Sequence, residues 1–291
     1  MEFLTTLING LSSGGTYAII AIGYTMVYGI AKMLNFAHGD IIMVGGYAMF
    51  TTLLLVNQPI LAVAVAIVFC VILGVSVERL AYRPLRGASP LAVLITAIGV
   101  SMLLQSLAQV IFGAASKMPT ELQISGALQI GSLSINYGTL VTLGVTVVLM
   151  IGLTLFVKYS KIGRAMVAVS EDRGAAQLMG INTNAIIAVT FAIGSALAAV
   201  AAYLMLMKAP SLSKTFGAMP GIKAFTAAVI GGIGSIPGAM LGGILLGVIE
   251  TISLSIPALQ SYTDAIEFAV LIVILLVKPA GLLGKIRREK V

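Results

Sequence analysis

The chain has 291 residues, of which 59% are hydrophobic and 9% are charged, and its mean hydropathy is +1.10. A soluble domain carries roughly 25% charged residues, so this chain has too little polar surface to keep a folded sphere in water. The net charge of +7 could suggest nucleic-acid binding. However, the basic residues stand at the ends of apolar runs, as they do in the cytoplasmic loops of membrane proteins. The composition therefore excludes a soluble domain and argues against a nucleic-acid partner.

Glycine, proline, asparagine and charged residues divide the chain into apolar elements. Several exceed the roughly 20 residues that a transmembrane helix needs, and they are continuously apolar rather than alternating, which favours helices over a barrel. We expect an all-α integral membrane fold, a polytopic bundle of about eight or nine spans in a single transmembrane domain over 1–291. The expected elements are 7–30, 41–56, 60–78, 91–112, 137–157, 186–207, 223–234, 238–255 and 262–277.

Most lysines and arginines fall into three clusters, and each cluster follows an odd number of apolar elements. All three can therefore lie on the cytoplasmic side, which places the N-terminus outside and the C-terminus inside. The first run lacks a basic leader and a cleavage site, so we expect a span there rather than a removed signal peptide. The expected cytoplasmic parts are a loop at 159–184 and a basic tail at 278–291. The clusters are Arg79, Arg83, Arg86; Lys158, Lys161, Arg164, Arg173; and Lys278, Lys285, Arg287, Arg288, Lys290.

Two interruptions of apolar sequence predict broken or re-entrant helices. One lies at 31–40 and the other at 231–238. The element 223–234 is too short to span alone, so 223–255 either crosses as a unit or turns back. Paired interruptions in two halves of a transporter often mark an internal repeat and the transport path, although the internal similarity here is faint. The residues expected at the breaks are Gly39, Asp40, Gly234, Ser235, Pro237 and Gly238.

The loop at 159–184 predicts a short helix over 171–179. Ser170 could cap it, Glu171 and Asp172 would suit its first turn, and Gly180 could end it. Such a helix either docks against another protein or is a connector on the membrane surface. The residues expected in a docking helix are Glu171, Asp172, Ala175, Ala176 and Gly180.

Polar residues within the spans are candidates for a translocation path. For Asn35 and His38 the alternative role is to satisfy backbone groups at the break, and Asp40 could simply cap the following helix. Glu250 lies within an apolar element, and acids inside a membrane are candidate functional residues. The topology, however, favours a water-facing position for Glu250 near the outer rim. The path candidates are Thr16, Tyr17, Tyr24, Asn35, His38, Thr96 and Gln105.

Several chemical signatures are absent from the sequence. It has no G-x-x-x-x-G-K-[ST] phosphate loop, no ladder of carboxylates through the spans, and one histidine and one cysteine. We therefore expect no catalytic residues, no metal site and no cofactor in this chain.

The sequence resembles the permease subunits of branched-chain amino acid ABC importers, of the LivH type. The similarity covers nearly the whole chain, with Lys278 at a position where the family often has arginine. The stretches that carry it are 15–18, 35–40, 78–86, 94–99, 171–181, the glycine-rich break 231–238 and the tail 278–284.

The resemblance implies a compact bundle like that of type II ABC importers, in a bacterial or archaeal cytoplasmic membrane. It implies a second permease subunit (a paralogue or another copy), two ATPase subunits that bind ATP and Mg, and an extracytoplasmic protein that delivers Leu, Ile or Val. It also implies that the helix at 171–179 is the coupling helix that docks on an ATPase. Other members of the wider group transport urea or amides, so such a solute is an alternative substrate. An ion-coupled secondary transporter, a channel and a membrane scaffold are the rival interpretations.

Overall fold

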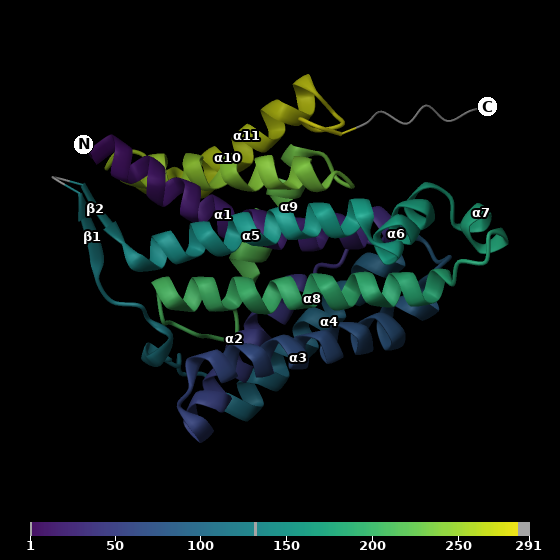
Figure 1. The fold of residues 1–291 in the computed structure, drawn as a ribbon, viewed down its shortest axis with the longest axis horizontal. Coiled ribbons are helices and arrows are strands. Elements are labelled where there is room, and N and C mark those ends of the chain that lie inside the picture. The colour runs from purple at the N-terminus through teal and green to yellow at the C-terminus, as the bar shows by residue number, and fades with distance from the viewer. Residues whose placement is uncertain (1, 131–132, 285–291) are drawn as a thin grey trace.

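The computed structural model describes residues 2–130 and 133–284, and within them the chain is almost entirely helical (Figure 1). Short π and 3-10 turns follow α3 at Glu78–Tyr82 and Arg83–Leu85, and others lie at Thr120–Leu122 and Gln260–Tyr262. The helices are α1 (Glu2–Ala31), α2 (His38–Val56), α3 (Pro59–Val77), α4 (Pro90–Phe112), α5 (Tyr137–Tyr159), α6 (Lys161–Glu171), α7 (Arg173–Leu178), α8 (Thr183–Lys208), α9 (Ala218–Gly231), α10 (Ile236–Ser255) and α11 (Thr263–Val277).

Eight helices of the described chain are long and apolar enough to cross a membrane. They are α1–α5, α8, α10 and α11, while α9 is a shorter apolar helix. The nine expected elements are therefore present with shifted bounds, and the fold is the expected all-α polytopic bundle. A small antiparallel hairpin, β1 (Ala127–Ile130) and β2 (Leu133–Asn136), lies between α4 and α5.

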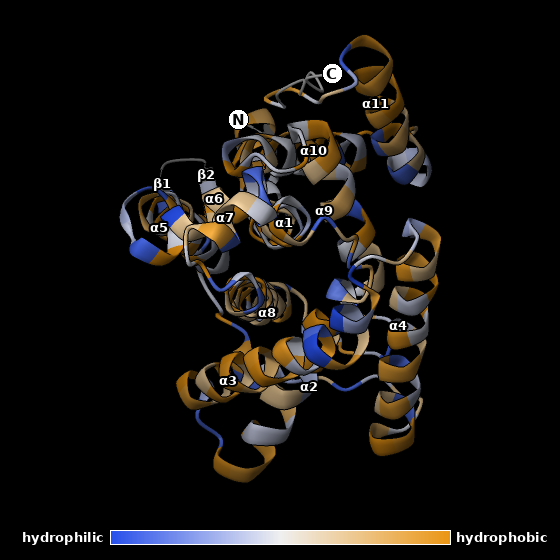
Figure 2. Ribbon diagram, turned by 90° about the vertical axis from the view of Figure 1, so that its right-hand side faces the viewer, coloured by the Kyte–Doolittle hydropathy of each residue, from blue (hydrophilic) through white to orange (hydrophobic). Residues whose placement is uncertain are grey.

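Burial separates inner helices from outer ones. In α1, 89% of the most apolar window is enclosed by the rest of the chain, against 11% in α5 and α11 and 22% in α4. Figure 2 shows α1 and α8 near the centre, with apolar residues along α4 and α11 at the outside. Because the outer helices are as apolar as the inner ones, their exposed faces are suited to lipid or to another membrane subunit.

The closest helix pair is α1 with α10, which run antiparallel and meet through small residues. A Cβ at Gly247 would overlap the backbone of Gly14, and a Cβ at Gly243 would overlap the backbone of Ala18. Close backbone approach through glycine is a common way to pack membrane helices, where lipid supplies no hydrophobic drive for their association.

One end of the bundle collects the basic residues, and we call it the basic end. Arg86, after α3, pairs with Glu78 and donates to the side chain of Asn184 at the start of α8. Arg173, in α7, donates to the carbonyls of Ile30 (3.1 Å) and Ala31 at the end of α1. The first two basic clusters therefore share one end. Of the third cluster, Lys278 is described, whereas Lys285, Arg287, Arg288 and Lys290 lie outside the described residues.

Two helices begin in the interior of the bundle rather than at an end. α2 starts at His38, whose ring occupies the space beside Gly23 of α1, because a Cβ at Gly23 would lie 2.7 Å from His38 Nε2. Gly23 in turn packs near Gly194, close to the middle of α8. The segment 32–37 therefore leads from the basic end back to mid-depth before α2 begins.

α9 begins at the same depth but is approached from the opposite end. The segment 209–217 follows α8 and reaches Gly217, where a Cβ would overlap the carbonyl oxygen of Gly39. α9 then runs to the basic end, where the amide of Leu283 donates to the carbonyl of Gly231 (2.9 Å). The N-termini of α2 and α9 thus meet inside the protein, a geometry that broken helices of transporters also show.

The element expected at 223–234 corresponds to α9 at Ala218–Gly231. α9 extends only from mid-depth to the basic end. The non-helical segment 209–217 spans the distance from the opposite end to mid-depth. α10 then returns antiparallel to α1. The break expected at 231–238 is thus a turn at the basic end. Of the two helix starts at mid-depth, that of α2 lies in the break expected at 31–40, whereas that of α9, after 209–217, was not expected from the sequence.

Candidate functional site

Two consecutive short helices, α6 and α7, occupy the segment expected to be a loop at 159–184. Ser160 caps α6 by accepting from the amide of Gly163 (2.8 Å). Asp172 separates the helices and caps α7, because its Oδ1 accepts from the amides of Gly174 (2.7 Å) and Ala175 (3.0 Å). Asp172 therefore holds α7 at an angle to α6.

The expected cap at Ser170 was wrong. Ser170 lies in the last turn of α6, and its hydroxyl donates to the carbonyl of Val167 (2.7 Å). Glu171 ends α6 instead of opening the next helix, so the helix expected over 171–179 is α7 at Arg173–Leu178. Gly180 does follow the helix in the left-handed region, with φ of +82°, as its expected role requires.

α7 projects beyond the bundle at the basic end (Figure 1). Ala176 is buried against the rest of the chain, and Ala175 faces out. Leu178 and Met179 are 91% and 83% exposed, and neither was among the residues expected in the docking helix. Their signal was available, since two large apolar residues directly before a helix-ending glycine are unusual on a short polar connector.

Arg173 ties the projecting helix to α1. Its guanidinium bonds to the last carbonyls of α1, which have no partner within that helix. Burial, with a smaller contribution from the nearby charge of Arg86, lowers the pKa of Arg173. A displacement of α7 would therefore be transmitted to the end of the most buried helix.

A pocket of about 870 Å³ opens beside α6 at the basic end. Its walls are the last turns of α1, the end of α5, one face of α6 and the α9–α10 connection at 233–237. A small cavity lined by Tyr24, Asn35 and Phe225 lies further in. Tyr28 and Ile233 line both spaces, so together they extend from the basic end toward mid-depth.

The expected path residues do not converge on one site. Tyr24 and Asn35 line the small cavity, while Asn35 also accepts from the hydroxyl of Tyr82 (2.8 Å). His38 packs edge-on against Tyr24, with ring centroids 4.7 Å apart, and lines neither space. The other four candidates lie elsewhere. The hydroxyl of Thr16 donates to the carbonyl of Ser12, and that of Tyr17 donates to Glu250. On α4, Thr96 is half-buried and Gln105 donates to Asp40.

Asp40 does not cap α2, contrary to one expectation. The helix already begins at His38, with Ala37 at the cap position and no side-chain cap bond. The Asp40 carboxylate instead accepts from Nε2 of Gln105 (2.8 Å), which joins α2 to α4. Gly39 lies beside it in the first turn of α2.

At the other break, Ser235 caps α10 by accepting from the amide of Gly238 (3.2 Å). Pro237 occupies the first turn of α10, where a backbone N–H would have no partner within the helix, so its absence removes no hydrogen bond. Gly234 lies between α9 and α10 with φ of +93°, a conformation that glycine adopts without strain. Of the four residues expected at this break, Gly234 and Ser235 connect the helices while Pro237 and Gly238 lie within α10.

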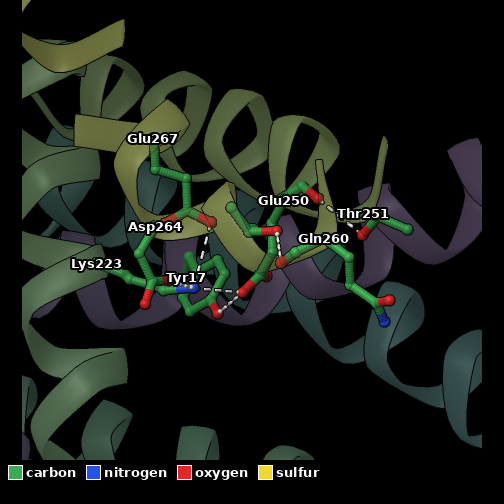
Figure 3. A network of polar contacts seen from close by, with 9 residues as sticks. Tyr17, Lys223, Glu250, Thr251, Gln260, Asp264 and Glu267 are labelled. Atoms are coloured by element: carbon green, nitrogen blue, oxygen red, sulfur yellow. Dashed lines mark hydrogen bonds and ion pairs between the residues drawn. The ribbon is translucent and has the colours of Figure 1, made fainter. Parts of the chain in front are cut away.

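A cluster of ionised groups lies between mid-depth and the end opposite the basic end (Figure 3). Nζ of Lys223 in α9 lies 2.6 Å from Glu250 in α10, and 2.9 Å and 3.2 Å from Asp264 and Glu267 in α11. The hydroxyl of Tyr17 in α1 donates to Glu250 (2.9 Å). The expectation that Glu250 faces water at the rim was wrong, because its side chain is only 14% exposed and is paired with Lys223.

Eight apolar spans, two helices that start at mid-depth and a pocket open at one end define a multi-pass membrane permease subunit. Residues 6–275 match the family described as branched-chain amino acid transport system / permease component. The chain therefore belongs to that family, whose members are membrane components of ABC importers, and the bundle agrees with a type II importer subunit.

Individual relatives match along their whole length. The chain is 47% identical to the high-affinity branched-chain amino acid transport system permease protein BraD of Pseudomonas aeruginosa, covering 100% of this chain and 98% of BraD. It is 44% identical, with the same coverage, to the corresponding permease protein LivH of Escherichia coli. A probable LivH of Methanocaldococcus jannaschii is 30% identical over 91% of this chain and 88% of its own. No solved structure matches the chain at a comparable level of significance.

Proposed function

We propose that this chain is a membrane-spanning subunit of an ATP-driven importer of Leu, Ile and Val. The observation that carries the proposal is the full-length similarity to BraD and LivH, whose names state this transport system. The partners are a second permease subunit, two ATPase subunits that bind ATP and Mg, and a substrate-binding protein outside the cell. This chain itself supplies the passage in the cytoplasmic membrane of a bacterium or archaeon, and ATP hydrolysis occurs on the ATPase subunits.

α7 is the part of this chain suited to receive the ATPase. It projects from the basic end, which the positive-inside rule assigns to the cytoplasm, and it presents Leu178 and Met179 to solvent. Large exposed apolar side chains of this kind are typical of an interface. Closure of the ATPase pair would push α7, and Arg173 and α6 would pass the movement to α1 and to the pocket.

The interior spaces suit a small zwitterion with an aliphatic side chain only once the bundle opens. The small cavity has a volume of about 10 Å³, roughly that of one water. When it widens, the polar side chains of Tyr24 and Asn35 would meet the charged end of such a solute and Phe225 its aliphatic part. Alternating access would open this region to each side in turn, with selection made largely by the external binding protein.

Copurification tests the system as a whole. We expect the chain to copurify with two ATPase subunits, and leucine-loaded binding protein to stimulate ATP hydrolysis by the reconstituted assembly. Uptake by the purified chain alone under an ion gradient would contradict the proposal and favour a secondary transporter.

Replacement of Ala175 by Arg should uncouple transport. The exposed face of α7 would then carry a bulky charge that cannot fit a cleft on the ATPase, while the buried side at Ala176 is unchanged. We expect leucine-stimulated ATP hydrolysis and leucine uptake to fall to a small fraction of the unmodified level, with unchanged amounts of chain in the membrane. The matched control is Lys161→Ala on α6, and undiminished uptake by Ala175→Arg would refute the docking role.

Replacement of Asn35 by Ala should slow leucine uptake several-fold. The change removes a polar group from the small cavity and leaves the Tyr82 hydroxyl without its acceptor. Initial rates of ATP-driven uptake in proteoliposomes measure the effect. Gln109→Ala, at the exposed end of α4, is the control, and equal rates for both variants would show that Asn35 lies off the path.

A further inference from the structure

The pocket at the basic end has a lining that matches one class of small molecule. Three cationic side chains, Lys32, Lys158 and Arg164, and one acid, Glu171, lie on its walls. Among the described residues, the lining therefore carries more positive than negative groups, with a single acid. A volume of about 870 Å³ is within the range of roughly 300–1,000 Å³ that small-molecule sites occupy.

The lining also has an apolar part, to which several helices contribute. Ile30 of α1, Met166 of α6 and Ile236 of α10 contribute to it. A site for phosphate or another inorganic anion has no use for an aliphatic wall. A carboxylate joined to an ammonium group and an aliphatic side chain would use the cations, the acid and the wall together.

Thr25 points to a ligand independently of the charges. It lines the pocket from α1, its side chain is 1% exposed, and its Oγ1 has no hydrogen-bond partner among the described residues. A buried hydroxyl without a partner is destabilising, because its desolvation is not compensated. A ligand carboxylate or ammonium group at the inner end of the pocket would satisfy it.

The backbone at Lys32 is a further sign. Its φ of +54° is in the left-handed region, which is strained for a residue with a Cβ. Strained positions of this kind cluster at ligand sites and switches. Here the conformation ends α1 and sets the Lys32 side chain on the pocket wall.

We propose that this pocket binds an aliphatic amino acid from the cytoplasmic side. Lys32 and Arg164 hold its carboxylate, Glu171 faces its ammonium group, and Met166 and Ile236 contact its side chain. The inference rests on the proposed function and adds to it a second amino-acid site within this one chain. Because α6 forms one wall and leads directly into α7, occupancy of the pocket would oppose movement of α7, so accumulated product would slow further import.

Cysteine protection tests the site in the assembled, nucleotide-free transporter. Val167 lines the pocket on α6 and is 48% exposed, whereas the chain's single natural cysteine, Cys70, is buried. In Val167→Cys we expect L-leucine to slow labelling by a membrane-impermeant maleimide, and inorganic phosphate at the same concentration to leave labelling unchanged. Lys161→Cys, exposed on the same helix and outside the pocket lining, is the matched control and should label at one rate throughout.

The variant Arg164→Gln should weaken the leucine protection at least about tenfold, because a charge-assisted hydrogen bond to the carboxylate is lost. Absence of protection by leucine would overturn the proposal, as would equal protection by phosphate, which would reveal a simple anion site. Protection by phosphatidylglycerol vesicles but not by leucine would also overturn it in favour of a lipid headgroup. ATP-driven leucine uptake is measured on the same preparation: if uptake is present without protection only this inference fails, and if uptake is absent the proposed function fails.

Discussion

Replacement of Gly247 by Val should prevent the chain from forming a stable bundle. A Cβ at Gly247 would overlap the amide nitrogen and Cα of Gly14, and backbone atoms of a buried helix cannot move aside as a side chain can. α1 is the most enclosed span, so its separation from α10 would disturb every helix packed on it. We expect the free energy of unfolding to fall by about 3 kcal/mol or more. Overpacking of a core costs typically 1–3 kcal/mol, and here the overlap is with backbone atoms.

Thermal unfolding of the detergent-solubilised protein measures this effect, with the monodisperse fraction as the readout. Gly152→Val in α5 is the matched control, because a Cβ there meets no atom within 4 Å and the change of helix propensity is the same. A Gly247→Val protein that melts within a degree or two of Gly152→Val would show that α1 and α10 are not held this closely.

The spans could be predicted from sequence because their signal is local and repeated. An apolar run of about 20 residues bounded by charge needs no knowledge of its neighbours, and α4, α5 and α8 were found within a few residues of their bounds. The half-helix α9 was placed five residues too late. Its first turn follows Ser213, Lys214 and Thr215, and such polar residues are typical of an aqueous loop unless the surrounding helices are known.

Caps were harder to predict because neighbouring residues compete for the role. Ser170, Glu171 and Asp172 are all compatible with a helix start, and the choice depended on where α6 ends. α6 itself was missed because it packs on α8 and α1 with only one apolar face, so its hydropathy is far below that of a span. The pairing of Asp40 with Gln105, 65 residues away, depends on the fold and has no local signal.

The ion cluster around Lys223 could not be predicted either, because its charged members come from three helices. From the sequence, Glu250 was expected at the outer rim. The pairing within the cluster needs α9, α10 and α11 to meet, which no spacing in the sequence indicates. The function of the cluster follows from its placement: the one cation on the half-helix α9 pairs with carboxylates on α10 and α11, which holds α9 against both helices.

Replacement of Lys223 by Met should therefore be among the most damaging changes in the chain. Glu267 is fully buried and its Oε2 has no hydrogen-bond partner in the part of the chain that the structure describes, so loss of Lys223 would leave the carboxyl groups of Glu250 and Glu267 without their cation in a low-dielectric interior. Breaking a buried pair from one side costs about 3–5 kcal/mol. We expect a correspondingly large fall in thermal stability and in the amount of folded protein recovered from membranes, and Lys161→Met, at an exposed position, should have little effect.

The double variant Lys223→Met/Glu267→Gln separates charge from packing. Since the amide carries no charge, removal of the buried carboxylate should restore a substantial part of the lost stability, and the two changes should be strongly non-additive. If the double variant is instead as unstable as the sum of the single variants, the Lys223 side chain acts through its packing and the electrostatic account is wrong. If stability returns but leucine uptake does not, the cluster has a role in the movement of α9 against α11 as well as in holding them together.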